Sequence, residues 1–293
     1  MLCNDCPRRC GAIRDDNTPG GLCRSPSLPV IARAAPHFGE EPCISGERGS
    51  GTVFFSGCNL GCVFCQNREI SRGGVGKPVS RERLRDVFLE LQDLGVHNIN
   101  LVTGSHFVRP IAEALSEARL RIPVVWNSSG YESIESLRML DGLVQVYLPD
   151  LKYMDGAAAK RYSFAADYPE VAAAAIAEMY RQRGDFVLGE DGLMKSGVLI
   201  RHLILPENEE NTRAVIDFVA EHYPGKAVMF SLMSQFTPMP GTERFPELQL
   251  RVGRIANARL CDYAAQRGIA FGYTQEPESA TDEMIPAFDL TGV

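Results

Sequence analysis

The chain has 293 residues, a length that fits either two average domains or a single α/β barrel. Apolar residues make up 45% of it and charged residues 23%, as in a globular protein with a large core, so general disorder is excluded. A formal net charge of −7 argues against nucleic acid or anionic lipid as partners. No apolar run reaches the roughly 20 residues of a membrane span and no signal peptide is recognisable, so we expect a cytoplasmic protein.

Residues 1–45 are rich in Cys, Pro, Gly and Arg and lack apolar periodicity. We expect a small cysteine-rich N-terminal extension that folds around a metal centre or docks on the rest of the chain. Its four cysteines are Cys3, Cys6, Cys10 and Cys23. Four thiolates suit either zinc or an iron–sulfur centre, and their spacing does not distinguish the two. Four reduced thiols without a metal are the alternative.

In residues 46–293, short runs of β-branched residues alternate with longer segments whose apolar residues recur with the period of a helix. This pattern predicts parallel strands joined by crossover helices. We expect an α/β fold, a partial (β/α)6 TIM-like barrel. Ser80 and Gly95 are the expected start and stop signals of its first helix. The expected strands are 52–57, 98–104, 122–127, 143–149, 197–205 and 227–234, and the expected helices are 80–95, 108–119, 131–140, 168–184, 211–222 and 246–267.

Three further cysteines, Cys58, Cys62 and Cys65, lie within eight residues directly after the first expected strand of this barrel. The C-terminal ends of barrel strands are where such folds carry their chemistry. A full protein shell for a 4Fe-4S cluster takes four thiolates, so three leave one iron open to another ligand. A zinc loop with a remote fourth ligand is the alternative, although zinc sites usually present paired cysteine knuckles.

The CxxxCxxC spacing, with Phe64 before the last cysteine, resembles the radical S-adenosylmethionine (SAM) superfamily. The branch that the chain resembles is related to the pyruvate formate-lyase activating enzyme and carries an extra N-terminal cysteine group. Further segments support this resemblance in chain order: 6–11 (CPRRCG), 37–42 (HFGEEP), 49–58 (GSGTVFFSGC), 98–103 (NINLVT), 127–132 (NSSGYE), 149–153 (PDLKY) and 199–203 (LIRHL).

The resemblance implies a 4Fe-4S cluster and SAM as cofactors. The reduced cluster would give one electron to SAM, and the resulting 5′-deoxyadenosyl radical would abstract a hydrogen atom from a protein or peptide, commonly a glycyl radical enzyme. It also implies an electron donor such as flavodoxin or ferredoxin. Radical SAM chemistry on a small molecule or peptide, and a non-catalytic iron–sulfur electron carrier, are the two alternative functions.

The resemblance also assigns site residues. Asp150 and Lys152 match polar groups near SAM and are the expected catalytic residues, although a surface ion pair is the alternative. Asn127 and Ser128 match a segment near the SAM ribose. Arg201 is expected at the SAM carboxylate, with a plain salt bridge as the alternative.

One departure from the family concerns the turn after the second expected strand. Activating enzymes usually carry Gly-Gly-Glu there to bind the SAM amino group, whereas this chain has Thr103-Gly104-Ser105-His106. Thr103 and Ser105 can accept from an ammonium group, and so can a neutral His106. The ligand of the amino group therefore stays open among these three residues.

Overall fold

The computed structural model describes residues 3–16, 18–275 and 286–293. Over these residues the chain forms one ten-stranded sheet with helices between its parallel strands. The strands are β1 (Val30–His37), β2 (Ser50–Phe55), β3 (Lys77–Pro78), β4 (Ile99–Val102), β5 (Val124–Ser128), β6 (Val146–Pro149), β7 (Val187–Leu188), β8 (Met194–Leu203), β9 (Met229–Met233) and β10 (Gly272–Thr274).

The helices vary from single turns to the 16 residues of α7. They are α1 (Pro42–Ser45), α2 (Arg68–Ser71), α3 (Arg81–Asp93), α4 (Val108–Ala118), α5 (Ile134–Met139), α6 (Gly156–Ser163), α7 (Tyr168–Arg183), α8 (Glu209–His222) and α9 (Arg254–Gln266). Two short 3₁₀ helices accompany them, η1 (Ser105–Phe107) and η2 (Pro246–Gln249).

The parallel part of the sheet follows chain order, as β2-β4-β5-β6-β8-β9-β10. Buried β-branched and aromatic residues form these strands, and all five residues of β5 are buried, as expected for a sheet covered on both faces. Trp126 and Tyr147 belong to the core that the sheet shares with its helices. The sheet stays open, because its edge strands β10 and β3 do not pair with each other.

This arrangement confirms the α/β class and all six expected strands, with shifted ends. The expected helix 246–267 is wrong in part: the extended residue Leu250 ends η2, and α9 begins only after Gly253. The sequence interpretation missed β10, which is short and has little buried surface. It also placed residues 30–37 in the N-terminal extension, whereas they form β1, antiparallel to β2.

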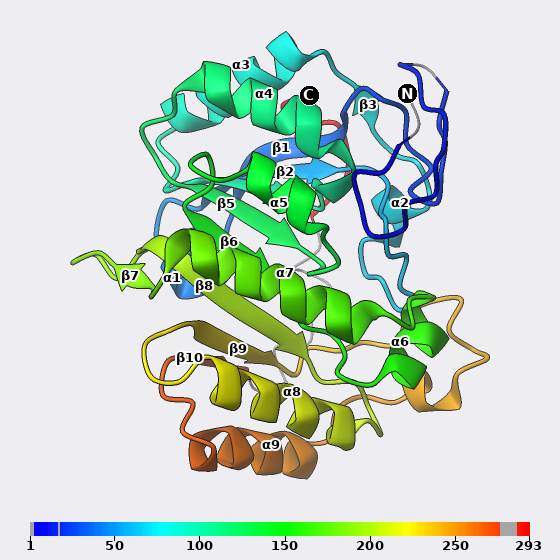
Figure 1. Ribbon diagram of the computed structural model, residues 1–293, viewed down its shortest axis with the longest axis vertical. Helices are drawn as coiled ribbons and strands as arrows, with labels where there is room; N and C mark the ends of the chain where they lie inside the picture. The colour runs from blue at the N-terminus through cyan, green and yellow to red at the C-terminus, as the bar shows by residue number, and fades with distance from the viewer. Residues whose placement is uncertain (1–2, 17, 276–285) are drawn as a thin grey trace.

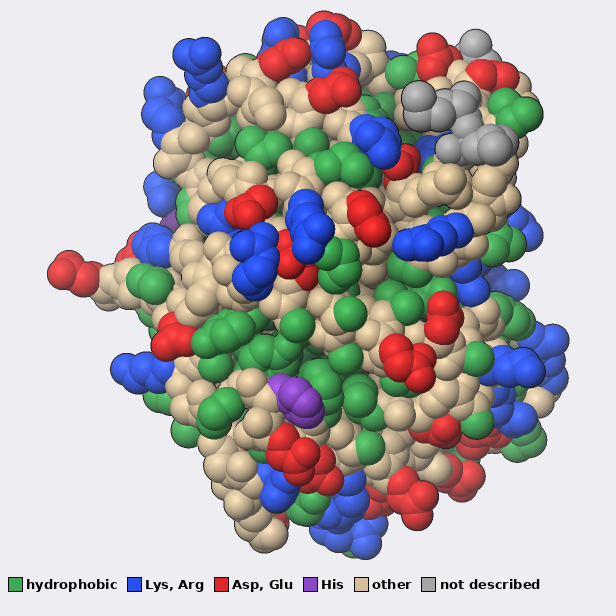
Figure 2. All heavy atoms as spheres, in the orientation of Figure 1, with side chains coloured by type: hydrophobic (Ala, Val, Ile, Leu, Met, Phe, Trp, Pro, Cys, Tyr) green, Lys and Arg blue, Asp and Glu red, His purple; other side chains and the backbone are tan. Residues whose placement is uncertain are grey.

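The parallel strands point their C-terminal ends toward one side of the molecule, where the N-terminal segment, α2 and α6 also lie (Figure 1). Helices α3, α4, α5, α7 and α8 cover the sheet on the viewer's side. Acidic and basic side chains are interspersed over that face (Figure 2). No helix among the described residues has the length and apolar character needed to cross a bilayer.

Helix α3 begins at the expected N-cap, since the Ser80 hydroxyl accepts a hydrogen bond from the Arg83 backbone N–H at 3.2 Å. Ser80→Ala leaves that N–H without its partner, so we expect a loss of about 1 kcal/mol of stability and a lower thermal midpoint. Ser116→Ala is the control, because this exposed hydroxyl bonds only the Ala112 carbonyl within α4. Equal midpoints for the two variants would contradict the role of the cap.

Candidate active site

The loop between β2 and α2 holds Cys58, Cys62 and Cys65 at the C-terminal side of the sheet, as expected. Each sulfur accepts a hydrogen bond: Cys58 Sγ from the Leu60 N–H at 3.4 Å, Cys62 Sγ from the Ser163 hydroxyl at 3.0 Å, and Cys65 Sγ from the Ser71 hydroxyl at 3.4 Å. Such donors stabilise thiolates and tune the potential of a cluster. Three soft sulfur ligands in a hydrogen-bonded shell fit an iron–sulfur cluster.

Burial governs the protonation of these thiols. It raises the pKa of Cys62 to about 12, and it also raises the pKa of Cys65. The nearby charge of Lys152 acts in the opposite direction on both. The free thiols of Cys62 and Cys65 therefore hold their protons at neutral pH, and binding of a metal centre displaces them.

Aromatic rings pack behind the loop. Phe64 is buried, and its ring centroid lies 6.4 Å from that of Tyr162 and 6.1 Å from that of Phe236. The Val63 N–H donates to the Tyr162 carbonyl at 2.9 Å, which ties the loop to α6. Phe64, the aromatic residue of the cysteine motif, thus forms part of an apolar wall beside the three cysteines, where we expected it to contact the cofactor.

A buried ion pair occupies the end of β6. Lys152 Nζ lies 2.6 Å from Asp150 Oδ2, and both side chains are 18% exposed. Burial disfavours both charges, yet each partner counteracts it, so the pKa of Asp150 is lowered and that of Lys152 is raised. Lys152 also interacts electrostatically with Cys62 and Cys65, so the pair lies beside the cysteine loop and not on the outer helical surface.

Arg201 of β8 joins this pair to other strands. Its guanidinium donates to Asp150 Oδ1 at 3.0 Å, to Glu40 Oε2 at 2.9 Å and to Asn127 Oδ1 at 2.6 Å. Glu40 Oε1 in turn accepts from Asn127 and from Asn100, both at 3.0 Å. We call this set the interior polar network: Glu40, Asn100, Asn127, Asp150, Lys152 and Arg201.

The sequence interpretation missed two members of this network, Asn100 and Glu40, and Glu40 is the one that links the strands. It stands in the segment 37–42, which supported the family resemblance, but no role was assigned to it. Its side chain is 9% exposed and accepts from residues on three different strands, β4, β5 and β8. The available signal was a pair of acidic residues, Glu40 and Glu41, beside an otherwise apolar strand.

The other expected cofactor residues lie at the same ends of β4 and β5. Ser128 is buried, and its hydroxyl accepts from the Gly130 N–H at 3.2 Å. Thr103 is half-buried in the left-handed conformation, with φ of 62°. Ser105 in η1 is buried and donates its hydroxyl to Glu132.

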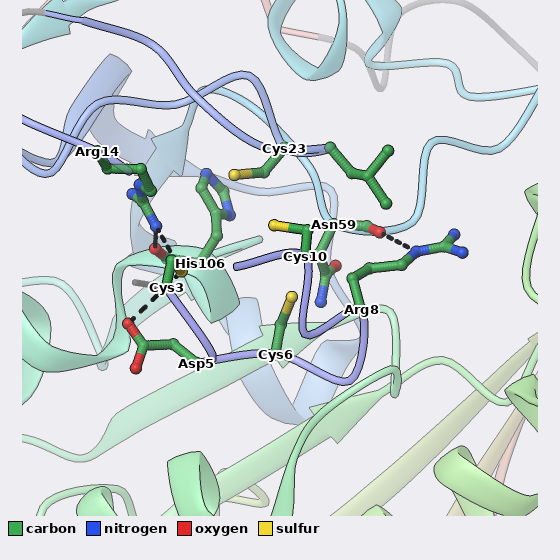
Figure 3. A pocket seen from close by; sticks show the side chains of 10 residues that line it. Cys3, Asp5, Cys6, Arg8, Cys10, Arg14, Cys23, Asn59 and His106 are labelled. Atoms are coloured by element: carbon green, nitrogen blue, oxygen red, sulfur yellow. Dashed lines mark hydrogen bonds between the residues drawn. The ribbon is translucent and has the colours of Figure 1, made fainter. Parts of the chain in front are cut away.

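His106 lies deeper in the fold. Burial lowers its pKa to about 3, so the imidazole is neutral, and its Nε2 lies 2.8 Å from the Ser56 carbonyl oxygen. Its ring lines the cavity formed by the N-terminal cysteines (Figure 3). The structure thus brings Asn127, Asp150, Lys152 and Arg201 into one network and places His106 outside it.

Glu132 makes stability depend on pH. Burial raises its pKa to about 7 from a usual value of 4.5, so the folded state keeps this proton in a range where the unfolded chain has lost it. Stability therefore falls as the pH rises from about 4.5 to about 7, by about 3 kcal/mol at 1.4 kcal/mol for each unit. In Glu132→Gln we expect the unfolding midpoint to change less between pH 5 and pH 8.

The matched control is Glu135→Gln, three residues further along the chain on the surface of α5, where the side chain is 70% exposed. Anaerobic thermal unfolding at the two pH values measures both variants. A Glu132→Gln profile parallel to that of the wild type would show that Glu132 titrates normally.

Several known proteins are similar to the chain. An uncharacterised protein of Methanocaldococcus jannaschii is 28% identical over 260 residues, which cover 85% of this chain and 70% of that protein. SuiB of Streptococcus suis, solved with its precursor peptide SuiA, is 14% identical with a TM-score of 0.50. The aligned part covers 78% of this chain and 49% of SuiB, so the chain spans about half of SuiB.

A domain of pyruvate-formate lyase-activating enzyme from Bacteroides vulgatus is 12% identical, with a TM-score of 0.42 over 57% of this chain and 91% of that one. The family model of the radical SAM superfamily matches residues 52–219, which include the three-cysteine loop and most of the interior polar network. This match spans more than half of the chain, and the chain is therefore an enzyme of the radical SAM superfamily, which uses a 4Fe-4S cluster and SAM.

Proposed function

We propose that this enzyme cleaves SAM reductively at a cluster held by Cys58, Cys62 and Cys65 and that it abstracts hydrogen from a protein or peptide. The observation that carries the proposal is the buried Asp150–Lys152 pair beside three hydrogen-bonded thiols at the C-terminal side of the sheet. An electron carrier needs no ion pair of this kind next to an iron with an open position.

A cluster held by Cys58, Cys62 and Cys65 would, when bound and reduced, supply the electron for cleavage of SAM into methionine and a 5′-deoxyadenosyl radical. The residues of the chain set the conditions. Lys152 offsets negative charge at the thiolates, and Asp150 holds its ammonium in place. The wall of Phe64, Tyr162 and Phe236 keeps water from one side of the loop.

The contacts divide the expected SAM residues into three groups. Arg201 and Asn127 are hydrogen-bonded to each other, and Asn127 also bonds Glu40. Because Arg201 in turn donates to Asp150, we propose that these two residues position Asp150. Thr103, half-buried at the end of β4, and the Asp150–Lys152 pair are the groups that we propose for contact with SAM. Ser105 and Ser128 support the turns around them through their own hydrogen bonds.

The open sheet favours a polypeptide substrate. A protein loop needs lateral access to the radical, whereas a metabolite is better enclosed. Here the edge strands leave the sheet unclosed, and SuiB, which has a similar fold, is known bound to a precursor peptide. A glycyl radical enzyme is one such substrate, and a small molecule is the alternative.

The proposal includes an electron donor of the flavodoxin or ferredoxin type and a cytoplasmic location. Nine free thiols and an oxygen-sensitive cluster both suit a reducing compartment. No nucleic acid or membrane partner is proposed.

The first test is SAM turnover itself. Anaerobically reconstituted enzyme with dithionite and SAM should form 5′-deoxyadenosine, and its reduced-cluster electron paramagnetic resonance (EPR) signal should change when SAM is added. Cys62→Ser should lose both, whereas Cys261→Ser, on the distant helix α9, should keep both. A wild-type signal indifferent to SAM, with no 5′-deoxyadenosine, would favour the electron-carrier function.

The second test concerns the buried pair. Lys152→Ala and Asp150→Asn should each lower 5′-deoxyadenosine formation about 10-fold or more while iron content stays at the wild-type level. The surface ion pair of Lys195 and Asp191 provides matched controls. Lys195 Nζ lies 2.8 Å from Asp191 Oδ2, but the two side chains are 44% and 52% exposed. Lys195→Ala and Asp191→Asn should keep wild-type turnover, and equal turnover in all four variants would exclude Asp150 and Lys152 from the site.

A further inference from the structure

The four N-terminal cysteines line one cavity, together with His106 and Asn59 (Figure 3). They are spread over residues 3–23, yet Cys6 interacts electrostatically with Cys3, Cys10 and Cys23. We call them the N-terminal tetrad. All four are free thiols, so no disulfide stabilises this part of the chain.

Gly21 keeps the cavity open. Its φ is 72°, and a Cβ at this position would lie 3.0 Å from Cys10 Sγ and 3.9 Å from Cys23 Sγ. Any side chain would therefore enter the space between two thiols of the tetrad.

Two buried acceptor atoms on the same cavity have no hydrogen-bond partner among the described residues. They are Nδ1 of His106, which is 2% exposed, and Oδ1 of Asn59, which is 1% exposed. Unsatisfied buried polar atoms cost free energy, and a merely apolar packing of reduced thiols leaves that cost in place. Both residues line the cavity of the tetrad, so the cavity is polar as well as lined by sulfur.

The surroundings of the tetrad distinguish two kinds of centre. Four thiolates suit either a structural zinc ion or an iron–sulfur cluster in electron transfer. An electron-transfer centre must lie near its redox partner, whereas a structural zinc ion has no such requirement.

The tetrad also adjoins the three-cysteine loop. Asn59, which lines the cavity, stands directly after Cys58, and its carbonyl accepts from Arg8 Nε at 2.9 Å. The same guanidinium donates to the Leu60 carbonyl at 3.2 Å and to the Ser163 carbonyl at 3.0 Å. Arg8, between Cys6 and Cys10, thus fixes one cysteine group to the other.

We propose that Cys3, Cys6, Cys10 and Cys23 bind a second iron–sulfur cluster, which exchanges electrons with the SAM cluster across the wall formed by Asn59. The Arg14 guanidinium, with Nη1 3.5 Å from Cys3 Sγ, offsets its negative charge. One electron passes from the reduced second cluster to the oxidised SAM cluster, and an external one-electron protein donor replaces it. The exchange rests on the proposed function, whereas the presence of the second cluster does not.

Metal and sulfide analysis of the anaerobically reconstituted full chain tests the cluster. The wild type should hold about eight iron and eight sulfide, and Cys6→Ala/Cys23→Ala should hold about four of each. The remaining cluster in that variant should still change its EPR signal with SAM, which shows that the chain is folded. Cys62→Ser should keep the cluster that does not respond to SAM.

Gly21→Ala tests the cavity with every thiol in place, and we expect a loss of iron like that of the double variant. Gly142→Ala is matched to it, because φ is 83° there but no atom lies within 4 Å of the added Cβ. That control should keep the wild-type iron content.

The electron exchange has its own measurement. When both clusters are reduced, their EPR signals should broaden each other, and Cys6→Ala/Cys23→Ala should relieve the broadening. Two clusters without mutual broadening would overturn the exchange but not the second site. One zinc ion per chain that disappears in the double variant, or about four iron in both proteins, would overturn the second cluster, whether or not SAM is cleaved.

Discussion

The site depends on the burial of one guanidinium. Arg201 lies among the strands at 15% side-chain exposure, where an unpaired charge costs several kcal/mol. Three acceptors from three other segments meet this requirement: Glu40, Asn127 and Asp150. With Lys152, the network contains two carboxylates and two cations, so its charges balance. The position of Asp150, and through it that of Lys152, follows from this balance.

The same balance extends to the cysteine loop. The positive charge of Lys152 favours the thiolate forms of Cys62 and Cys65. It lowers the pKa of both thiols, whereas burial raises it. Loss of Asp150 would leave a buried ammonium whose position is no longer defined. The network therefore links the fold of the sheet to the electrostatics of the cluster. Arg201 acts on the cysteine loop through Asp150 and Lys152.

The N-terminal segment depends on polar contacts and not on a core of its own. Arg8 bonds carbonyls of the cysteine loop and α6, and Ser133 and Ser136 of the α5 start donate to the Asp5 carbonyl. These bonds fix the segment on the C-terminal side of the sheet, above the ends of the strands (Figure 1). A centre bound by the tetrad would therefore stand next to the SAM cluster, in the position that an electron relay requires.

The sequence by itself determined the parallel α/β fold, because hydrophobic periodicity and the Ser80 cap are local signals, and it determined the superfamily through the cysteine spacing of the loop after β2. It also placed Asp150 and Lys152 at a strand end. Only the tertiary structure decided which groups satisfy Arg201, since Glu40 lies 161 residues away from it in the chain. Pairing of buried charges is a property of the assembled interior, where distance in space and exclusion of water set the energy, and no local pattern encodes either.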